Sequence, residues 1–190
     1  MTSILLASLL SLLPPARARG APPAEQTAPG PSRTLTDAEI QDRVEAYLGT
    51  IDTRTSTEDW RALGARGAAI LEQVAQDPRT LPTRRAKAVA GLSAIGASTS
   101  GDVLVSLARS EQAPLTVRLA AVDGAPFVIP APRLAAALKP VLESAKDGVL
   151  RGAAAEVLSR HGGCTLVRAQ ARREADKIRM QRALERCGQR

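Results

Sequence analysis

The chain has 190 residues, of which 44% are hydrophobic, 24% are charged and only 2% are aromatic. This length suits one domain with a buried core. Three aromatic residues, Tyr47, Trp60 and Phe127, are too few for a platform that stacks single-stranded nucleic acid or for a cage that binds a cation. One histidine, His161, and two cysteines leave no set of soft ligands for a zinc site. We therefore expect no metal or other cofactor.

The first segment of the chain reads as a targeting signal. Residues 4–13 form the apolar run ILLASLLSLL, which is shorter than the roughly 20 residues that a membrane-spanning helix needs. The small residues Ala16 and Ala18 occupy the positions that a signal peptidase reads. We predict a signal peptide over 1–18 and export to the periplasm or the medium. No Lys or Arg precedes Ile4, so a disordered apolar tail or a misassigned start is the alternative interpretation.

A proline-rich segment follows and predicts a disordered linker over 19–34. It contains Pro22, Pro23, Pro29 and Pro31 among Gly, Ala and Ser, and such a composition buries too little apolar surface to offset the entropy of ordering. The remaining residues, 35–190, form the predicted folded domain. Its first helix is expected over 36–48, because Thr36 followed by Glu39 is a capping-box pattern.

The rest of the chain repeats itself with a step of 33 residues. Arg85, Arg118 and Arg151 follow one another at this step. The same step relates Ala88, Ala121 and Ala154, and also Val89, Val122 and Ala155. Each period contains two stretches with helical spacing of apolar residues, separated by Pro or Gly. The predicted helix pairs cover 57–96, 99–126, 131–162 and 164–188. The opening helix of the first pair is expected to run unbroken from 57 to 76, and Pro140 is expected to kink its helix.

These units resemble HEAT-like helical repeats, of the type also found in proteins associated with pigment lyases. The resemblance is carried by RAKAVAGLSAIG at 85–96, by VRLAAV at 117–122 and by residues 150–158. Together the matching units cover about two-thirds of the chain. The resemblance implies an all-α fold: a right-handed α-solenoid of about four antiparallel helix pairs plus an N-terminal helix, each pair burying its apolar face against the next. It also implies that the repeated arginine is structural and bonds toward the preceding helix or loop. A non-repeating, alanine-rich helical bundle is the alternative.

The two cysteines fall within the last predicted pair. A single helix over 164–187 would hold the two sulfur atoms roughly 34 Å apart, which no disulfide spans. Aligning Lys177 with Arg151 makes 176–187 the second helix of a fourth pair, with 164–172 as its partner. The start of one helix and the end of the other then lie at the same end of an antiparallel hairpin. We predict a disulfide between Cys164 and Cys187, which suits an oxidising compartment.

The net charge of +7 is unevenly distributed. Residues 36–59 are mainly acidic, and residues 164–190 contain eight bases: Arg168, Arg172, Arg173, Lys177, Arg179, Arg182, Arg186 and Arg190. Three interpretations of the basic end remain open: a solvated face, a surface for an acidic protein or an envelope polyanion, and a nucleic-acid surface. Export and the absence of a continuous basic stripe make nucleic acid the weaker one. The opposite charges of the two ends permit weak head-to-tail self-association, which salt would screen.

The resemblance implies that second helices line the inner wall of the stack. Polar residues there that escape the core pattern are the candidate binding surface: Arg84, Lys87, Asp123, Glu156, Arg160, Lys177, Arg179, Arg182 and, with less weight, Gln181. The sequence contains no glycine-rich phosphate loop, nucleophile elbow or metal-ligand spacing. We expect no catalytic residues and no enzyme activity. The predicted function is an exported scaffold that binds a protein partner. The alternatives are a protein that binds nucleic acid or another polyanion, and an accessory subunit of a pigment-lyase-like enzyme.

Overall fold

The computed structural model describes residues 34–50, 55–174 and 178–189. The predicted signal peptide (1–18) and, except for Thr34, the predicted linker (19–34) lie outside the described residues. Lys177, one of the candidate binding residues, also lies outside them. Residues 35–190 form one compact unit, and the description concerns this unit alone.

The described residues are helical, without a strand among them. The helices are α1 (Asp37–Gly49), α2 (Thr57–Ala62), α3 (Gly64–Gln76), α4 (Pro82–Ile95), α5 (Gly101–Arg109), α6 (Leu115–Val128), α7 (Ala131–Ser144), α8 (Gly148–Arg160), α9 (Cys164–Ala171) and α10 (Ile178–Gly188). A 3-10 turn over Ser98–Ser100 precedes α5. No helix within 34–50, 55–174 or 178–189 combines the length and the apolar character needed to cross a bilayer.

Local sequence signals explain several helix boundaries. Thr36 caps α1, since its hydroxyl accepts from the Glu39 amide and the Glu39 carboxylate accepts from the Thr36 amide at 2.8 Å. Proline begins α4, where the missing N–H costs nothing. Gly96 ends α4 with a left-handed φ of 74° that suits glycine. His161 is the C-cap of α8.

The prediction of one unbroken helix over 57–76 was wrong. Leu63 is both the C-cap of α2 and the N-cap of α3, and Gly64 has a φ of 60°. A left-handed residue interrupts the helical path, so the chain turns there and places α2 against α4. Pro140 and Pro126 both lie inside helices that continue beyond them, α7 and α6 respectively.

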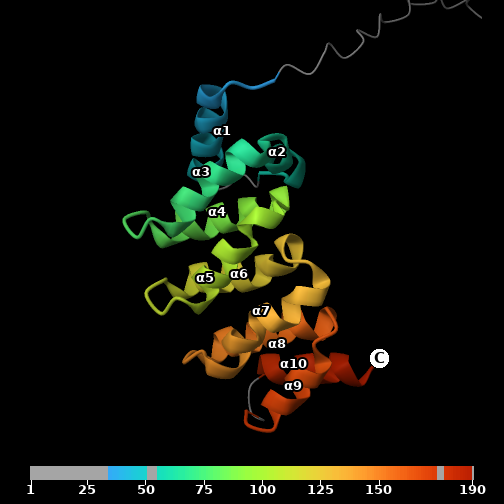
Figure 1. Ribbon diagram of the computed structural model, residues 1–190. Coiled ribbons are helices and arrows are strands. Elements are labelled where there is room, and N and C mark those ends of the chain that lie inside the picture. Colours follow the sequence, from blue (N-terminus) through green and yellow to red (C-terminus); the bar gives the residue numbers. More distant parts are fainter. Residues whose placement is uncertain (1–33, 51–54, 175–177, 190) are drawn as a thin grey trace, which may run out of the picture. The chain divides into compact units, whose positions relative to one another are not determined.

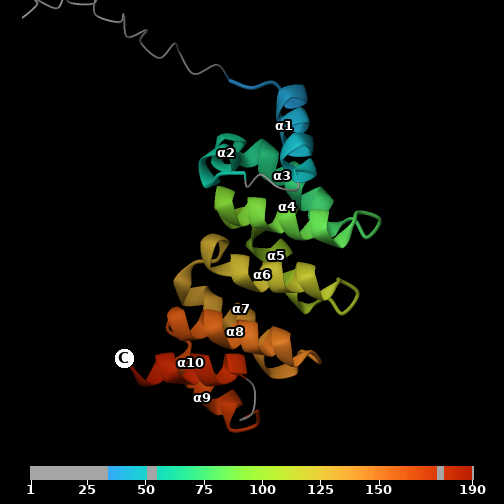
Figure 2. The same cartoon turned by 180° about the vertical axis from the view of Figure 1, so that it is seen from behind.

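The helices pack as antiparallel neighbours in chain order. Within residues 57–188, α3 contacts α4, α5 contacts α6, α7 contacts α8 and α9 contacts α10. The second members also contact one another in succession, since α4 packs on α6, α6 on α8 and α8 on α10. Figures 1 and 2 show these pairs following one another from α3 and α4 to α9 and α10, with the connecting loops of the pairs along one edge.

Small apolar side chains at the repeated positions form the centre of the core. Ala88, Ala121 and Ala154 are each completely buried, as are Val89, Val122 and Ala155. Glycine brings some of these helices closer still. A Cβ atom built at Gly152 would lie only 2.7 Å from the Cβ of Arg179. The backbone of α8 at Gly152 is therefore in close contact with the Arg179 side chain of α10. The shortage of aromatic residues follows from this close spacing, because large rings would overpack it.

Polar contacts attach α1 to the first helix pair. Arg66 binds the Asp37 carboxylate and donates to the Leu35 carbonyl at 2.6 Å. At the other end of α1, Arg84 forms an ion pair with Glu45, and the Lys87 ammonium donates to the Thr50 carbonyl at 2.7 Å. The apolar contact comes from Ile40, Val44 and Leu48, which are buried in the common core. In addition, the Tyr47 and Trp60 rings meet edge to face at 5.3 Å.

Each of the repeated arginines caps the end of the helix before it. Arg85 Nε donates to the carbonyl of Ala75, near the end of α3, at 2.9 Å. Arg118 Nε donates to the carbonyl of Ala108, near the end of α5, at 3.3 Å. Arg151 reaches the carbonyls of Ala145 and Lys146, just beyond α7. The last carbonyls of a helix lack partners within it, and a cation is favourable at this end of the helix dipole.

A disulfide joins the two ends of the last pair. Cys164 begins α9 and Cys187 lies in the last turn of α10, with their Cα atoms 5.5 Å apart. Arg168 of α9 donates to the Cys187 carbonyl at 2.6 Å and reinforces the same contact. The predicted Cys164–Cys187 disulfide is confirmed.

Candidate functional site

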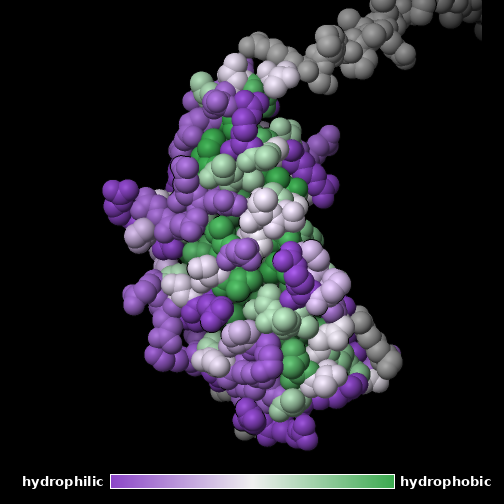
Figure 3. All heavy atoms as spheres, in the orientation of Figure 1, coloured by the Kyte–Doolittle hydropathy of each residue, from purple (hydrophilic) through white to green (hydrophobic). Residues whose placement is uncertain are grey.

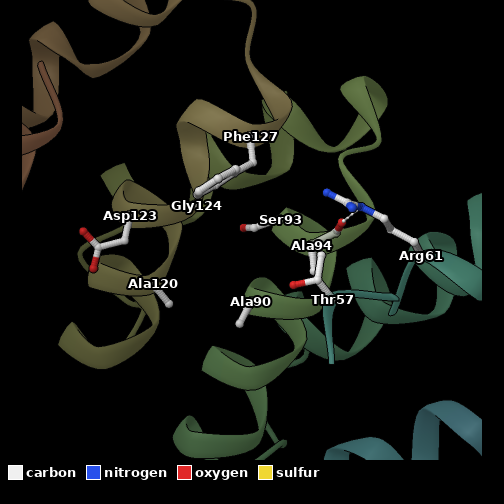
Figure 4. A pocket seen from close by; sticks show the side chains of 9 residues that line it. All are labelled: Thr57, Arg61, Ala90, Ser93, Ala94, Ala120, Asp123, Gly124 and Phe127. Carbon is white, nitrogen blue, oxygen red and sulfur yellow. Dashed lines mark hydrogen bonds between the residues drawn. The ribbon is translucent and has the colours of Figure 1, made fainter. Parts of the chain in front are cut away.

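An open groove crosses α2, α4 and α6. Its volume is about 560 Å³, and its lining comprises Thr57, Arg61, Ala90, Ser93, Ala94, Ala120, Asp123, Gly124 and Phe127. Figure 4 shows these side chains around the groove, with those of α6 facing those of α4 and α2. The groove exists because small residues line its centre, so that no side chain fills the space between the two second helices.

The closeness of α4 and α6 is set at Gly124. A Cβ atom built there would lie 2.0 Å from Ser93 Oγ and 3.2 Å from Ser93 Cβ. The Ser93 hydroxyl is held in place because it donates to the Val89 carbonyl of its own helix at 2.9 Å. A larger residue at position 124 would push the helices apart and change the floor of the groove.

Phe127 supplies an exposed ring at the rim of the groove. It lies in the last turn of α6 and is 67% exposed. An exposed phenylalanine carries a cost in water that a binding partner can remove by covering it. Across the groove, Arg61 Nε donates to the Ala94 carbonyl at 3.2 Å, as the dashed line in Figure 4 marks. This bond fixes α2 against the end of α4 and leaves the rest of the guanidinium facing the opening.

Asp123 marks the edge of the groove toward the last two pairs. Its carboxyl group points away from Ser93 and Ala90 in Figure 4. Burial raises the pKa of Asp123, and the charge of Glu156 adds to this, whereas the positive charges of Arg179 and Arg160 lower it. No hydrogen bond or ion pair joins Asp123 to a described residue. Among the described residues, the Asp123 carboxylate therefore has no direct partner, and the residue is exposed at the edge of the groove.

The structure separates the predicted binding residues into two groups. Asp123, Glu156, Arg160 and Arg179 come together from α6, α8 and α10, and Arg179 lies 3.7 Å from the Glu156 carboxylate. Arg84 and Lys87 instead attach α1 to α4, as described above. Among the other predicted residues, Arg182 is exposed on α10, and Gln181 is exposed with a partner of its own. The two groups do not share the groove.

Sequence reasoning missed Phe127, Arg61, Ser93 and Thr57 as lining residues. One signal for Phe127 was present, since the 33-residue step places it in a row with Ala94 and Arg160. Because these three residues differ in size and polarity, their shared position in the repeat is expected to lie outside the common core. Arg61 and Thr57 had no such signal, because the break at Gly64 that brings α2 over the groove was not expected.

The faces of the molecule differ in polarity. In Figure 3, pale and green side chains gather along the middle of the visible face, and purple hydrophilic side chains gather along the edge where Figure 1 shows the loops within the pairs. Within the described residues, no group of three or more His, Cys, Asp or Glu side chains is arranged to hold a metal ion. Comparison of the chain with family models, with curated proteins and with solved structures gave no match.

Proposed function

We propose that the domain is a right-handed, HEAT-like α-solenoid that serves as an exported scaffold and binds a protein partner without catalysing a reaction. The repeat architecture is supported by the succession of contacts through α4, α6, α8 and α10 and by the arginine that caps each preceding helix. Stacks of this kind present a continuous wall of second helices on which a partner can lie.

The observation that carries the binding proposal is the exposed Phe127 beside an open groove. A docking surface needs apolar area that is worth covering and polar groups that fix the orientation of the partner. Phe127 and the alanines of the groove provide the first, and Asp123 and Arg61 provide the second from opposite sides. Since no other described residue bonds directly to Asp123, a donor from a bound protein would gain a hydrogen bond to its carboxylate.

Site-specific crosslinking in the native host tests this proposal. A photoreactive phenylalanine analogue placed at position 127 should crosslink one protein species, identified by mass spectrometry. The matched control is the same analogue at Leu81, which is 70% exposed but lies at the start of α4 outside the groove. Excess unlabelled protein should suppress the crosslink, whereas excess Phe127→Ala variant should not. Equal crosslinking from both positions would contradict a docking role for the groove.

Export is supported by the disulfide, because cytosolic reductants keep most thiols reduced. The proposed signal peptide leads to a specific expectation for the N-terminus. Sequencing the protein recovered from the periplasm or the medium should read from Arg19, within two residues. A cytosolic protein that still begins at Met1, with reduced cysteines, would contradict both the signal peptide and the export proposal.

A further inference from the structure

A second cavity, of about 260 Å³, lies at the opposite end of α6 from Phe127. Arg109, Glu111 and Arg118 line it from α5, the following loop and α6, and Pro140, Ser144 and Ala145 line it from the end of α7. It therefore opens on the edge where the loops within the pairs lie, away from the Phe127 groove. The experiments on the two sites are independent.

Arg118 is the buried cation of this cavity. The residue is only 8% exposed, and its single hydrogen bond to a described residue is the one from Nε to the Ala108 carbonyl. The two Nη atoms form no hydrogen bond to a described residue, and they are not among the fully buried atoms without a partner, so they reach the solvent where Arg118 lines the cavity. A guanidinium held in place with its donors unused is prepared to bind an acceptor.

The charges around the cavity are positive in balance. Glu111, which also lines the cavity, is paired with Lys146, whose ammonium lies 2.6 Å from its carboxylate. That hydrogen bond and the charge of Lys146, together with the more distant Arg118, lower the pKa of Glu111, so it stays ionised and paired. Arg109 contributes a further positive charge to the lining. With Arg109 and Arg118 against Glu111 alone, the lining keeps a net positive charge.

The next repeat shows what occupies the equivalent place. Arg151 follows Arg118 by 33 residues and caps α7 as Arg118 caps α5. Arg151 Nε also forms an ion pair with the Glu174 carboxylate, without a hydrogen bond from that nitrogen, and their side chains are only 19% and 12% exposed. Glu174 lies beyond the end of α9, in the connection to the second helix of the following pair. A nearly buried carboxylate from the following pair thus completes the environment of Arg151.

The corresponding segment for Arg118 offers no such group. It is the connection between α7 and α8, and its carboxylate belongs to Asp147. Asp147 caps α8, accepting from the Val149 amide at 2.7 Å and from the Leu150 amide at 3.3 Å. The Asp147 carboxylate therefore binds the first amides of α8. Beside Arg118, the cavity lies at the position that corresponds to Glu174 beside Arg151.

We propose that this cavity binds a carboxylate through the Nη atoms of Arg118, at the position that corresponds to Glu174 beside Arg151. The ligand is a small organic acid or the acidic side chain of a bound polypeptide, since both present the same group. Charge-assisted hydrogen bonds to a buried guanidinium favour an ionised, planar acceptor. A single pair of this kind corresponds to a dissociation constant of about 1 to 10 mM for a small probe.

Side-chain NMR of arginine tests the proposal directly. The Nε–Hε signal of Arg118, identified by its loss in Arg118→Lys, should shift in a saturable way with succinate and with a blocked Gly-Glu-Gly peptide. The neutral analogue succinamide should leave the signal unchanged. Tighter binding of the peptide by about tenfold would assign the ligand to a polypeptide, and equal or tighter binding of succinate would assign it to a free acid.

Two variants separate binding from the structural role of the arginine. Arg85→Gln removes a helix-capping arginine outside the cavity and should leave succinate binding unchanged. Ser144→Glu alters an exposed residue of the lining and supplies an internal carboxylate, so binding should weaken at least tenfold while Arg118 stays in place. The proposal is overturned if Arg118 shows no saturable shift up to about 50 mM, if succinamide binds equally, or if Ser144→Glu binds as the wild type does.

Discussion

Removal of the disulfide should loosen the last helix pair without loosening the first. The bond closes a loop with a sequence separation of 23 residues, for which the chain-entropy relation gives about 3.4 kcal/mol at 25 °C. In a stack where each pair contacts only its neighbours, this loss acts mainly on the terminal pair. The opening equilibrium of α9 and α10 should therefore rise about 300-fold.

Hydrogen exchange read by mass spectrometry measures this effect segment by segment. The variant is Cys164→Ser with Cys187→Ala, because Cys187 is 1% exposed and a buried hydroxyl there would add its own cost. Peptides from 164–188 should lose protection, while peptides from α3 and α4 keep it. Dithiothreitol should bring the wild-type protein to the same state and leave the variant unchanged. Protection in 164–188 that changes less than about threefold, or an equal loss in α3, would refute the reasoning.

Two further changes test the packing and the electrostatics. Gly152→Ala should lower the free energy of unfolding by about 1–2 kcal/mol in urea. The new methyl group meets the Cβ of Arg179, and this overpacking outweighs the gain in helix propensity. The control is Gly188→Ala, which should change stability far less because no atom lies within 4 Å of the new Cβ. Asp123→Asn should stabilise the domain at pH 7 but not at about pH 3. The raised pKa means that the native state holds its proton more tightly than the unfolded chain, so stability falls as the pH rises from the ordinary value of 3.8 through the raised pKa. An Asn variant that is less stable than wild type at pH 7 would contradict this sign.

Local signals and the repeat step were enough to predict much of the helical framework. Thr36 and Glu39 form the capping box that their spacing indicates, because such a box depends on four consecutive residues. The cysteines meet because aligning the last segment with the repeat places them at one end of a hairpin. In both cases the decisive contact follows from the sequence within a single helix or pair.

The groove and the cavity could not be predicted in the same way. Phe127 is apolar and lies in a helix, so its pattern alone indicates core, whereas the folded chain leaves it 67% exposed. The cavity at Arg118 depends on Asp147 being used elsewhere, which is a relation between two pairs. Sites of this kind arise where neighbouring repeats differ. A repeat pattern identifies only the residues that the repeats have in common, so it does not predict such sites.

Different interactions hold the terminal helices at the two ends of the domain, so different solutes should destabilise the two ends. At the first end, the ion pairs of α1 involve side chains such as Asp37, which is 85% exposed, and pairs of that kind weaken as ions screen them. At the last end, a covalent bond that ions do not affect holds α9 to α10. We expect added salt to weaken the attachment of α1 first, although its apolar side chains stay in the core, and a reductant to weaken that of α10 first. Salt and a reductant would therefore loosen opposite ends of the same domain.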